Sequence, residues 1–348
     1  MPAPPVRYAP LACLLLVAAG CGRGGADQVG EAAPVETPAA LVDWAHTHDG
    51  ASLVVWDVAG DSAVVDVRGD VRRPVAGLTG LLLAAELARR AGRSLDTAAV
   101  LPASAVERRR LPGVDPPRPD ARASSLAGLA RRALAGDRAA ADVLLSTLGR
   151  EATGALPHRL GLDELDAPLP LGGLVLAWAP ADRPGPREAQ LASFLALGRP
   201  AQRDSAFARS RAYVKSPSYR AAERARLERG GLGLSPTDRR AAARATLPQG
   251  TARAYARLLA RAVREDLVDA DVSAAFLDLV PRPARDSLGE RGGLRLGVAE
   301  GVVDGVVGAA AVAERGRGGR IAVLLADDGV QDASALLLDL ARADSLGE

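Results

Sequence analysis

The stretch that decides the fold of this chain is Arg72-Arg-Pro-Val-Ala-Gly-Leu-Thr-Gly-Leu-Leu-Leu-Ala-Ala-Glu-Leu-Ala-Arg-Arg-Ala-Gly92. Its leucines and alanines recur with a helical period, and Glu86 is the only charged residue in its middle part, so the pattern predicts a helix buried on nearly all sides. Pro74 suits the first turn, and the final glycine suits the position after the last turn. Gly77 and Gly80 lie three residues apart, which leaves one helical face without side chains at about 1 kcal/mol per glycine.

The composition is that of an ordinary globular protein. The chain has 348 residues, of which 48% are hydrophobic and 25% charged, enough for a sizeable core. Its formal net charge of +2 gives no reason to expect a nucleic-acid partner. Lys215 is the only lysine, and the chain contains no asparagine. These two facts limit which catalytic motifs the sequence can encode.

The N-terminal residues predict export to a bacterial cell envelope. Residues 1–20 have the apolar run of a signal peptide and are too short to span a bilayer as a helix. Ala18-Ala19-Gly20-Cys21 is similar to a bacterial lipobox, which implies cleavage before Cys21 and a lipid anchor that leaves the protein facing the periplasm or the exterior. A plain secretory signal is the alternative. Residues 21–38 would form a flexible tether, and no cysteine would remain for disulfides or a thiolate nucleophile.

Beyond this tether, residues 39–345 predict one α/β (α+β) domain. Runs rich in valine, isoleucine and leucine predict five strands, at residues 52–58, 63–67, 294–298, 305–312 and 320–325. A turn at Gly301 is expected between the third and the fourth strand. We expect one five-stranded antiparallel sheet, formed by both ends of the chain and covered by the terminal helices, beside an all-helical lobe.

The domain is expected to consist of two lobes. The sheet lobe would comprise residues 39–72 and 290–345, and the helical lobe residues 73–289. An insertion is expected in the helical lobe at about residues 167–244, and the apolar, proline-rich segment 165–181 is interpreted as a packed loop.

Three stretches resemble class A β-lactamases and related penicillin-recognising serine hydrolases, and the resemblance covers nearly all of residues 39–345. Pro74–Leu87 is similar to the helix that opens with Ser-x-x-Lys. Leu134–Leu145 is similar to the Ser-Asp-Asn turn and the helix after it, and Arg295–Gly305 to the Lys-Thr-Gly edge strand. The resemblance implies a β-lactamase/transpeptidase-like fold. In that family the serine attacks an amide carbonyl, the lysine handles its proton, and the other two motifs hold the substrate.

None of the three motifs is intact in this chain. Carried across position by position, the nucleophile falls on Gly77 and the lysine on Gly80. The Ser-Asp-Asn turn becomes Gly136, Asp137 and Arg138, and Lys-Thr-Gly becomes Ala299, Glu300 and Gly301.

An error of alignment does not explain the loss. The sole lysine, Lys215, would need a serine at position 212, where Ala212 stands, and Lys215-Ser-Pro217 has proline where the strand motif needs glycine. No asparagine exists to complete Ser-Asp-Asn. Glu300 would also place a negative charge where the family attracts a substrate carboxylate, which disfavours binding.

Other candidate catalytic residues have structural interpretations that we favour. Thr79 is expected to cap or pack rather than to attack a substrate. His46, His48 and Asp49 lie at a predicted helix end, where histidine complements the helix dipole, so we expect no metal site. His158 lacks the partners of a Ser-His-Asp triad, since Asp163 is close to it only in sequence. Glu164 and Asp166 are the acids nearest to the place of a general base, but they have no nucleophile to activate.

The sequence therefore favours an envelope-anchored lipoprotein that has lost its catalytic residues. It would act as a binding or scaffolding module for peptidoglycan or a partner protein, without cofactor, metal or nucleic acid. The alternative is a serine hydrolase or β-lactamase-type enzyme that acts on a β-lactam or a cell-wall peptide with relocated catalytic residues. A third hypothesis is a structural lipoprotein whose cleft is filled.

Overall fold

The computed structural model describes residues 37–92, 94, 100–115, 123–282, 294–327, 330 and 332–342. The predicted signal peptide, Cys21 and the tether up to residue 36 lie outside the described residues. Val35–Glu348 group into one compact unit.

A five-stranded antiparallel sheet joins the two ends of the chain, which confirms the predicted fold class. The strand order is β2-β1-β9-β8-β7. The strands are β1 Ala51–Asp57, β2 Ser62–Val67, β7 Leu294–Val303, β8 Val306–Arg315 and β9 Gly318–Ala326. The edge strand β2 alternates between exposed and partly buried side chains, whereas β1 and β8 are buried along nearly their whole length, because helices cover both faces of the sheet.

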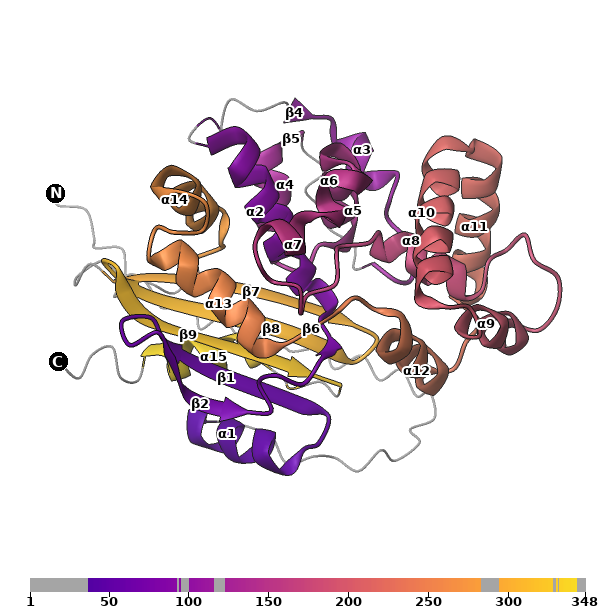
Figure 1. Cartoon of the computed structure of the whole chain (residues 1–348). Helices are drawn as coiled ribbons and strands as arrows, with labels where there is room; N and C mark the ends of the chain where they lie inside the picture. Colours follow the sequence, from indigo (N-terminus) through magenta and orange to yellow (C-terminus); the bar gives the residue numbers. More distant parts are fainter. Residues whose placement is uncertain are drawn as a thin grey trace, which may run out of the picture. The chain divides into compact units, whose positions relative to one another are not determined.

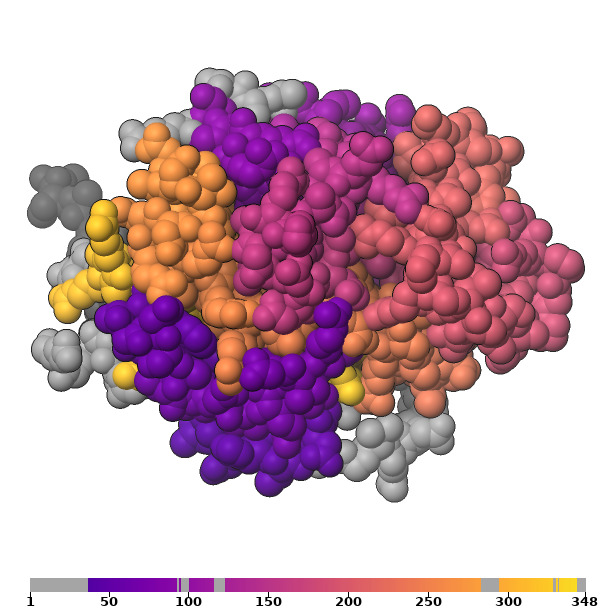
Figure 2. All heavy atoms as spheres, in the orientation of Figure 1, coloured from indigo at the N-terminus to yellow at the C-terminus, as the bar shows by residue number. Residues whose placement is uncertain are grey.

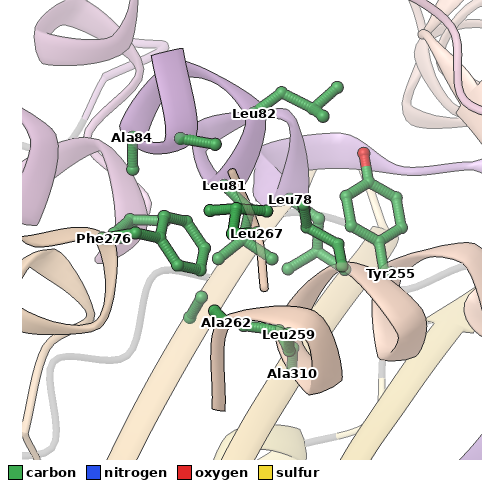
Figure 3. Close-up of a cluster of buried hydrophobic side chains, with 14 of the residues drawn as sticks. Leu78, Leu81, Leu82, Ala84, Tyr255, Leu259, Ala262, Leu267, Phe276 and Ala310 are labelled. Atoms are coloured by element: carbon green, nitrogen blue, oxygen red, sulfur yellow. The ribbon is translucent and has the colours of Figure 1, made fainter. Parts of the chain in front are cut away.

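The terminal helices α1 (Pro38–Thr47) and α15 (Ala333–Arg342) cover one face of the sheet (Figure 1). The other face packs against α13 (Ala252–Val263) and α2 (Thr79–Ala91). Leu78 and Leu81 there meet Leu259 of α13 and Phe276 of α14 (Ala270–Leu279) in a buried cluster (Figure 3). This apolar layer fixes α2, and with it the position that corresponds to the family's nucleophile, against the sheet.

Short helices and small two-stranded sheets complete the first part of the helical lobe. The helices are η1 Ala76–Leu78 (a 3₁₀ turn), α3 Ala103–Glu107, α4 Leu126–Leu134, α5 Arg138–Leu148, α6 Arg150–Gly154 and α7 Leu156–Arg159. In the small sheets, β3 (Arg73–Pro74) pairs with β6 (Gln249–Gly250), and β4 (Val100–Leu101) pairs with β5 (Ser124–Ser125). On the face seen in Figure 2, the orange atoms of α13 and α14 lie between the indigo N-terminal strands and the magenta helices around residue 150.

The predicted insertion contains five helices with a core of their own. They are α8 Leu171–Trp178, α9 Arg187–Leu195, α10 Arg199–Lys215, α11 Pro217–Gly230 and α12 Pro236–Thr246. Trp178 is fully buried in this core, and its indole N–H donates to Thr246 Oγ1 at 3.1 Å. α10 and α11 lie side by side on the right of Figure 1.

The prediction of a packed loop over residues 165–181 is wrong in its middle part, where Leu171–Trp178 form α8. Pro168 and Pro170 precede the helix, and Pro180 follows it. The carboxylate of Asp142 accepts the backbone N–H groups of Leu171 and Gly172, both at 2.9 Å. A distant side chain thus caps α8 and replaces the local capping signal that the sequence lacks.

Two other sequence predictions are corrected. The helix predicted over residues 72–92 begins as α2 only at Thr79, because residues 73–74 pair with β6 as a short strand. Gly92 follows the last turn of α2, as expected, with a φ of 51°. Gly301 is not a turn residue but lies inside β7, opposite Gly308. The turn follows at Asp304 and Gly305, whose φ angles of 47° and 86° suit an Asp-Gly hairpin turn.

Candidate functional site

The helix start and the edge strand meet where the family's nucleophile would stand. Gly77 lies in η1, and Gly301 of β7 packs directly against it, backbone to backbone. A β-carbon on Gly77 would lie 2.6 Å from the Cα of Gly301, and a β-carbon on Gly301 would lie still closer to the Cα of Gly77. Ordinary contacts between carbon atoms are about 3.5–4.0 Å. The position that corresponds to the nucleophile therefore has no room for a side chain.

The turn that corresponds to Ser-Asp-Asn closes the same contact from the side of α5. Gly136 has a φ of 78°, and a β-carbon on it would lie 3.2 Å from the carbonyl oxygen of Glu300. Glycine suits this turn both because it adopts a left-handed conformation without strain and because β7 approaches it closely. Gly77, Gly136 and Gly301 thus lie together at the crossing of η1, the turn and β7.

Asp137 is a structural residue of this turn. Its carboxylate caps α5 through the N–H of Ala140 at 3.2 Å and accepts from Arg132 at 2.7 Å and from Arg110 at 3.1 Å. Burial alone would raise the pKa of Asp137, but hydrogen bonds from Arg132 and the charge of Arg110 outweigh it and lower the pKa below its ordinary value. The side chain is 1% exposed. It stabilises the turn and offers nothing to a ligand.

Arg138 stands where the family has a substrate-holding asparagine. Its guanidinium donates to Asp115 Oδ1 through Nε at 3.0 Å and through Nη2 at 2.7 Å. Asp115 in turn accepts the backbone N–H of Leu111 at 2.6 Å. Arg138 is therefore engaged in a buried ion pair with the preceding loop.

The side chain of Glu300 does not face this crossing, which corrects the expected charge repulsion. Ala299 and Gly301 point toward α2 and η1, whereas Glu300 pairs with Ala309 and lies on the opposite face of the sheet, the face covered by α1 and α15. Successive side chains of a strand point to opposite faces. The charge at this position therefore faces away from Gly77.

Gly80 differs from Gly77 in its surroundings. It lies inside α2 and is buried, and a β-carbon on it would lie 3.4 Å from the carbonyl oxygen of Ala133 in α4. This is an ordinary van der Waals distance. A methyl group fits there, whereas the opposing backbone leaves no room for one at Gly77 and Gly301.

Comparison with known proteins agrees with the fold. No protein-family model matches the chain, and no curated protein matches it in sequence. Among solved structures, a β-lactamase from Sphaerobacter thermophilus DSM 20745 matches with a TM-score of 0.52 at 16% identity, over 89% of this chain and 97% of that one. A β-lactamase from Chitinophaga pinensis DSM 2588 matches with a TM-score of 0.51 at 14% identity, over 89% and 97%. The chain has a β-lactamase-like fold. At these identities the likeness concerns the fold alone.

The two acids nearest to the place of a general base are engaged in ion pairs of this β-lactamase-like fold. Glu164 pairs with Arg257 at 2.5 Å. Asp166 accepts from Arg72 at 2.6 Å and from the backbone N–H of Gln249 at 2.9 Å, which ties its loop to β6. Both carboxylates hold the loop before α8 to neighbouring elements.

Two other sequence candidates have the structural roles that their positions suggested. Thr79 is the first residue of α2 and is 3% exposed. His48 follows α1, where its Nδ1 lies 2.8 Å from the carbonyl oxygen of Trp44 and its ring stacks on the indole. Among the described residues, no three His, Cys, Asp or Glu side chains gather in a way that could hold a metal ion.

His158 has a partner that sequence reasoning did not expect. Its Nδ1 lies 3.0 Å from Oδ1 of Asp163, across the turn that follows α7. The two side chains are 87% and 72% exposed, so solvent screens the pair. The pair resembles the second half of a catalytic triad, but it lies in open solvent.

Within the part of the chain that the structure describes, no helix is long and apolar enough to cross a membrane. The expected lipid attachment at Cys21 concerns residues outside that part.

Proposed function

We propose that this β-lactamase-like protein has lost acyl transfer and acts as a binding or scaffolding module in the bacterial envelope. A lipid on Cys21 would hold it to a membrane, and its expected partner is peptidoglycan or an envelope protein. The observation that carries the proposal is the backbone contact between Gly77 and Gly301, which fills the place of the nucleophile. This arrangement also favours the hypothesis of a filled cleft over that of an open one.

The chemistry of acyl transfer supports the same reading. A serine nucleophile needs both a hydroxyl group and an adjacent base that takes its proton. Gly77 and Gly80 supply neither, and Arg138, at the place of the substrate-holding asparagine, is committed to a structural ion pair with Asp115. Loss of any one group would slow the reaction, whereas loss of all of them removes the covalent step.

The test of lost acyl transfer is hydrolysis of a chromogenic cephalosporin by the purified protein lacking residues 1–20. We expect a rate equal to that of a mock purification from the same host, with a true β-lactamase as the positive control. Hydrolytic activity that co-purifies with the protein, at a rate well above that of the mock purification, would contradict the proposal. The variant Gly77→Ala then asks whether such activity depends on this crossing.

Covalent probes separate the proposal from the alternative of relocated catalysis. The protein is incubated with a fluorophosphonate and with a labelled penicillin, and adducts are mapped by peptide mass spectrometry. We expect no adduct. An adduct on one serine or threonine, lost when that residue is replaced by alanine, would establish a relocated nucleophile. His158→Ala would then test whether the exposed His158–Asp163 pair assists it.

Envelope attachment and partner binding need separate measurements. The full-length chain is expected to fractionate with membranes and to incorporate labelled fatty acid, and Cys21→Ser should abolish both. Binding to peptidoglycan is measured by co-sedimentation with purified sacculi, where saturation would support it. Sedimentation no greater than that of a protein of similar size and charge would leave the envelope protein as the expected partner.

A further inference from the structure

A pocket of about 290 Å³ lies between α5 and α10, in the helical lobe. The helix α10 belongs to the predicted insertion, and none of the glycines at the crossing of η1 and β7 lines this pocket. Its wall carries four cationic side chains, two from the part of the helical lobe that precedes α8 and two from α10: Arg109, Arg150, Arg211 and Lys215. A volume of this size is at the lower end of the range for small-molecule sites.

Two of these cations have no carboxylate partner. Among the described residues, no Asp or Glu oxygen lies within 4.0 Å of the guanidinium of Arg211 or of the ammonium of Lys215, although both side chains belong to an arginine-rich helix with many ion pairs. Both residues are exposed, so they stand at the mouth of the pocket. They are available to a ligand.

Arg109 is the half-buried cation of the same wall. It donates to Ser146 Oγ at 2.8 Å and to Ser210 Oγ at 3.3 Å, both neutral groups that come from opposite walls. Burial lowers the pKa of Arg109, and the nearby charge of Asp142 offsets this only in part. Asp142 itself is fully engaged in capping α8. The charge of Arg109 is therefore held in place but not neutralised by direct contact.

The remaining wall is mainly apolar, although Asp142 and the hydroxyl groups of Ser146 and Ser210 also line it. Leu145 of α5 and Phe207 and Val214 of α10 line it, and the guanidinium of Arg150 lies 4.7 Å from the centre of the Phe207 ring. Arg150 also pairs with Asp204, so its charge is partly compensated. Cations at the mouth and an apolar wall together suit a ligand with an acidic group and an apolar body.

We propose that this pocket binds a small organic anion, which places a carboxylate or phosphate group near Arg109, Arg211 and Lys215 and an apolar body against Leu145 and Phe207. The inference goes beyond the proposed function, because it holds whether or not the crossing at Gly77 is closed. It gives the insertion a role in ligand recognition.

The sole lysine provides a direct test. Lys215 is the only side-chain amine in the chain, so its acetylation by an activated ester can be followed by mass spectrometry of one peptide. The protein without residues 1–20 is labelled in the presence of benzoate, phenyl phosphate, inorganic phosphate or neutral benzamide, all at constant ionic strength. We expect benzoate and phenyl phosphate to slow the labelling of Lys215 at least threefold, and benzamide and inorganic phosphate to leave it unchanged. Equal protection by benzamide would overturn the role of charge, and equal protection by inorganic phosphate would overturn the role of the apolar wall.

Variants then locate the site by calorimetric titration with phenyl phosphate. Lys215→Gln and Arg211→Gln remove charges from exposed side chains, and each is expected to weaken binding about fivefold or more without loss of fold by circular dichroism. The matched control is Arg229→Gln, an exposed arginine of α11 that does not line the pocket, which should leave the affinity unchanged. An equal loss in the control variant, or no measurable binding to the unmodified protein, would refute the proposal. These outcomes do not depend on cephalosporin hydrolysis, so failure here and failure of the proposed function are distinguishable.

Discussion

The close approach of Gly77 and Gly301 makes a sharp prediction about the smallest possible substitution. In Gly77→Ala the added methyl carbon would lie 2.6 Å from the Cα of Gly301. The obstacle is backbone, so no side-chain rotation relieves it, and β7 must retreat by about 1 Å to reach an ordinary carbon–carbon distance of ~3.5–4.0 Å. Overpacking of this kind costs roughly 1–3 kcal/mol.

Gly80→Ala is the matched control, since it adds the same methyl group three residues away in a position that is also buried. There the methyl would lie 3.4 Å from the carbonyl oxygen of Ala133, and α2 would gain up to about 1 kcal/mol from the helix propensity of alanine. We therefore expect opposite signs for the two variants.

Urea unfolding followed by circular dichroism measures the difference. With a dependence of about 3 kcal/mol per molar urea, Gly77→Ala should lower the unfolding midpoint by about 0.3–1 M, whereas Gly80→Ala should leave it unchanged or raise it. A Gly77→Ala midpoint equal to or above that of Gly80→Ala would refute the reasoning, because it would mean that space for a side chain exists between η1 and β7. A serine restored at position 77 would then be a realistic nucleophile.

Three further predictions concern charges and turns. Burial raises the pKa of Asp142 to about 6, against about 3.9 when unfolded, so its contribution to stability should fall by ~2 kcal/mol as the pH rises from about 4 to 6. Asp142→Asn should remove this slope from unfolding free energies measured across that range. Burial alone would raise the pKa of Glu86, but hydrogen bonds from Arg89 and Arg90 prevail and lower the pKa. The contribution of Glu86 to stability is therefore present above about pH 4.3 and is lost as the pH falls. Glu86→Gln should cost roughly 1–3 kcal/mol of unfolding free energy at neutral pH in the same assay. Gly305→Ala should cost about 1–2 kcal/mol, because the residue has a φ of 86°, and a thermal midpoint equal to that of the unmodified protein would contradict that turn geometry.

Much of the fold was predictable because local patterns determine it. The period of leucine and alanine identifies the buried part of α2, and the β-branched runs identify all five strands. The hairpin turn after β7 was misplaced at Gly301 although Asp304-Gly305 carries the stronger turn signal. A glycine in a strand signals either a turn or a close approach of another backbone, and only the packed structure distinguishes the two.

The pocket between α5 and α10 was not predictable from the sequence. Arg109 and Lys215 are far apart along the chain, and an arginine-rich composition hides the few cations that lack partners. The single lysine was the one available signal, but its neighbours in space depend on how α10 packs.

The sequence by itself determined which motifs are absent, because a chain with one lysine and no asparagine cannot encode the family's motifs in any alignment. Only the tertiary structure decided what occupies their place. The backbones of η1 and β7 meet there, although more than two hundred residues separate them, and whether two such segments touch or leave a cleft depends on the packing of the helices and strands that hold them. The physical reason is that residue identity is a local property, whereas the space around a residue is set by contacts with the rest of the fold.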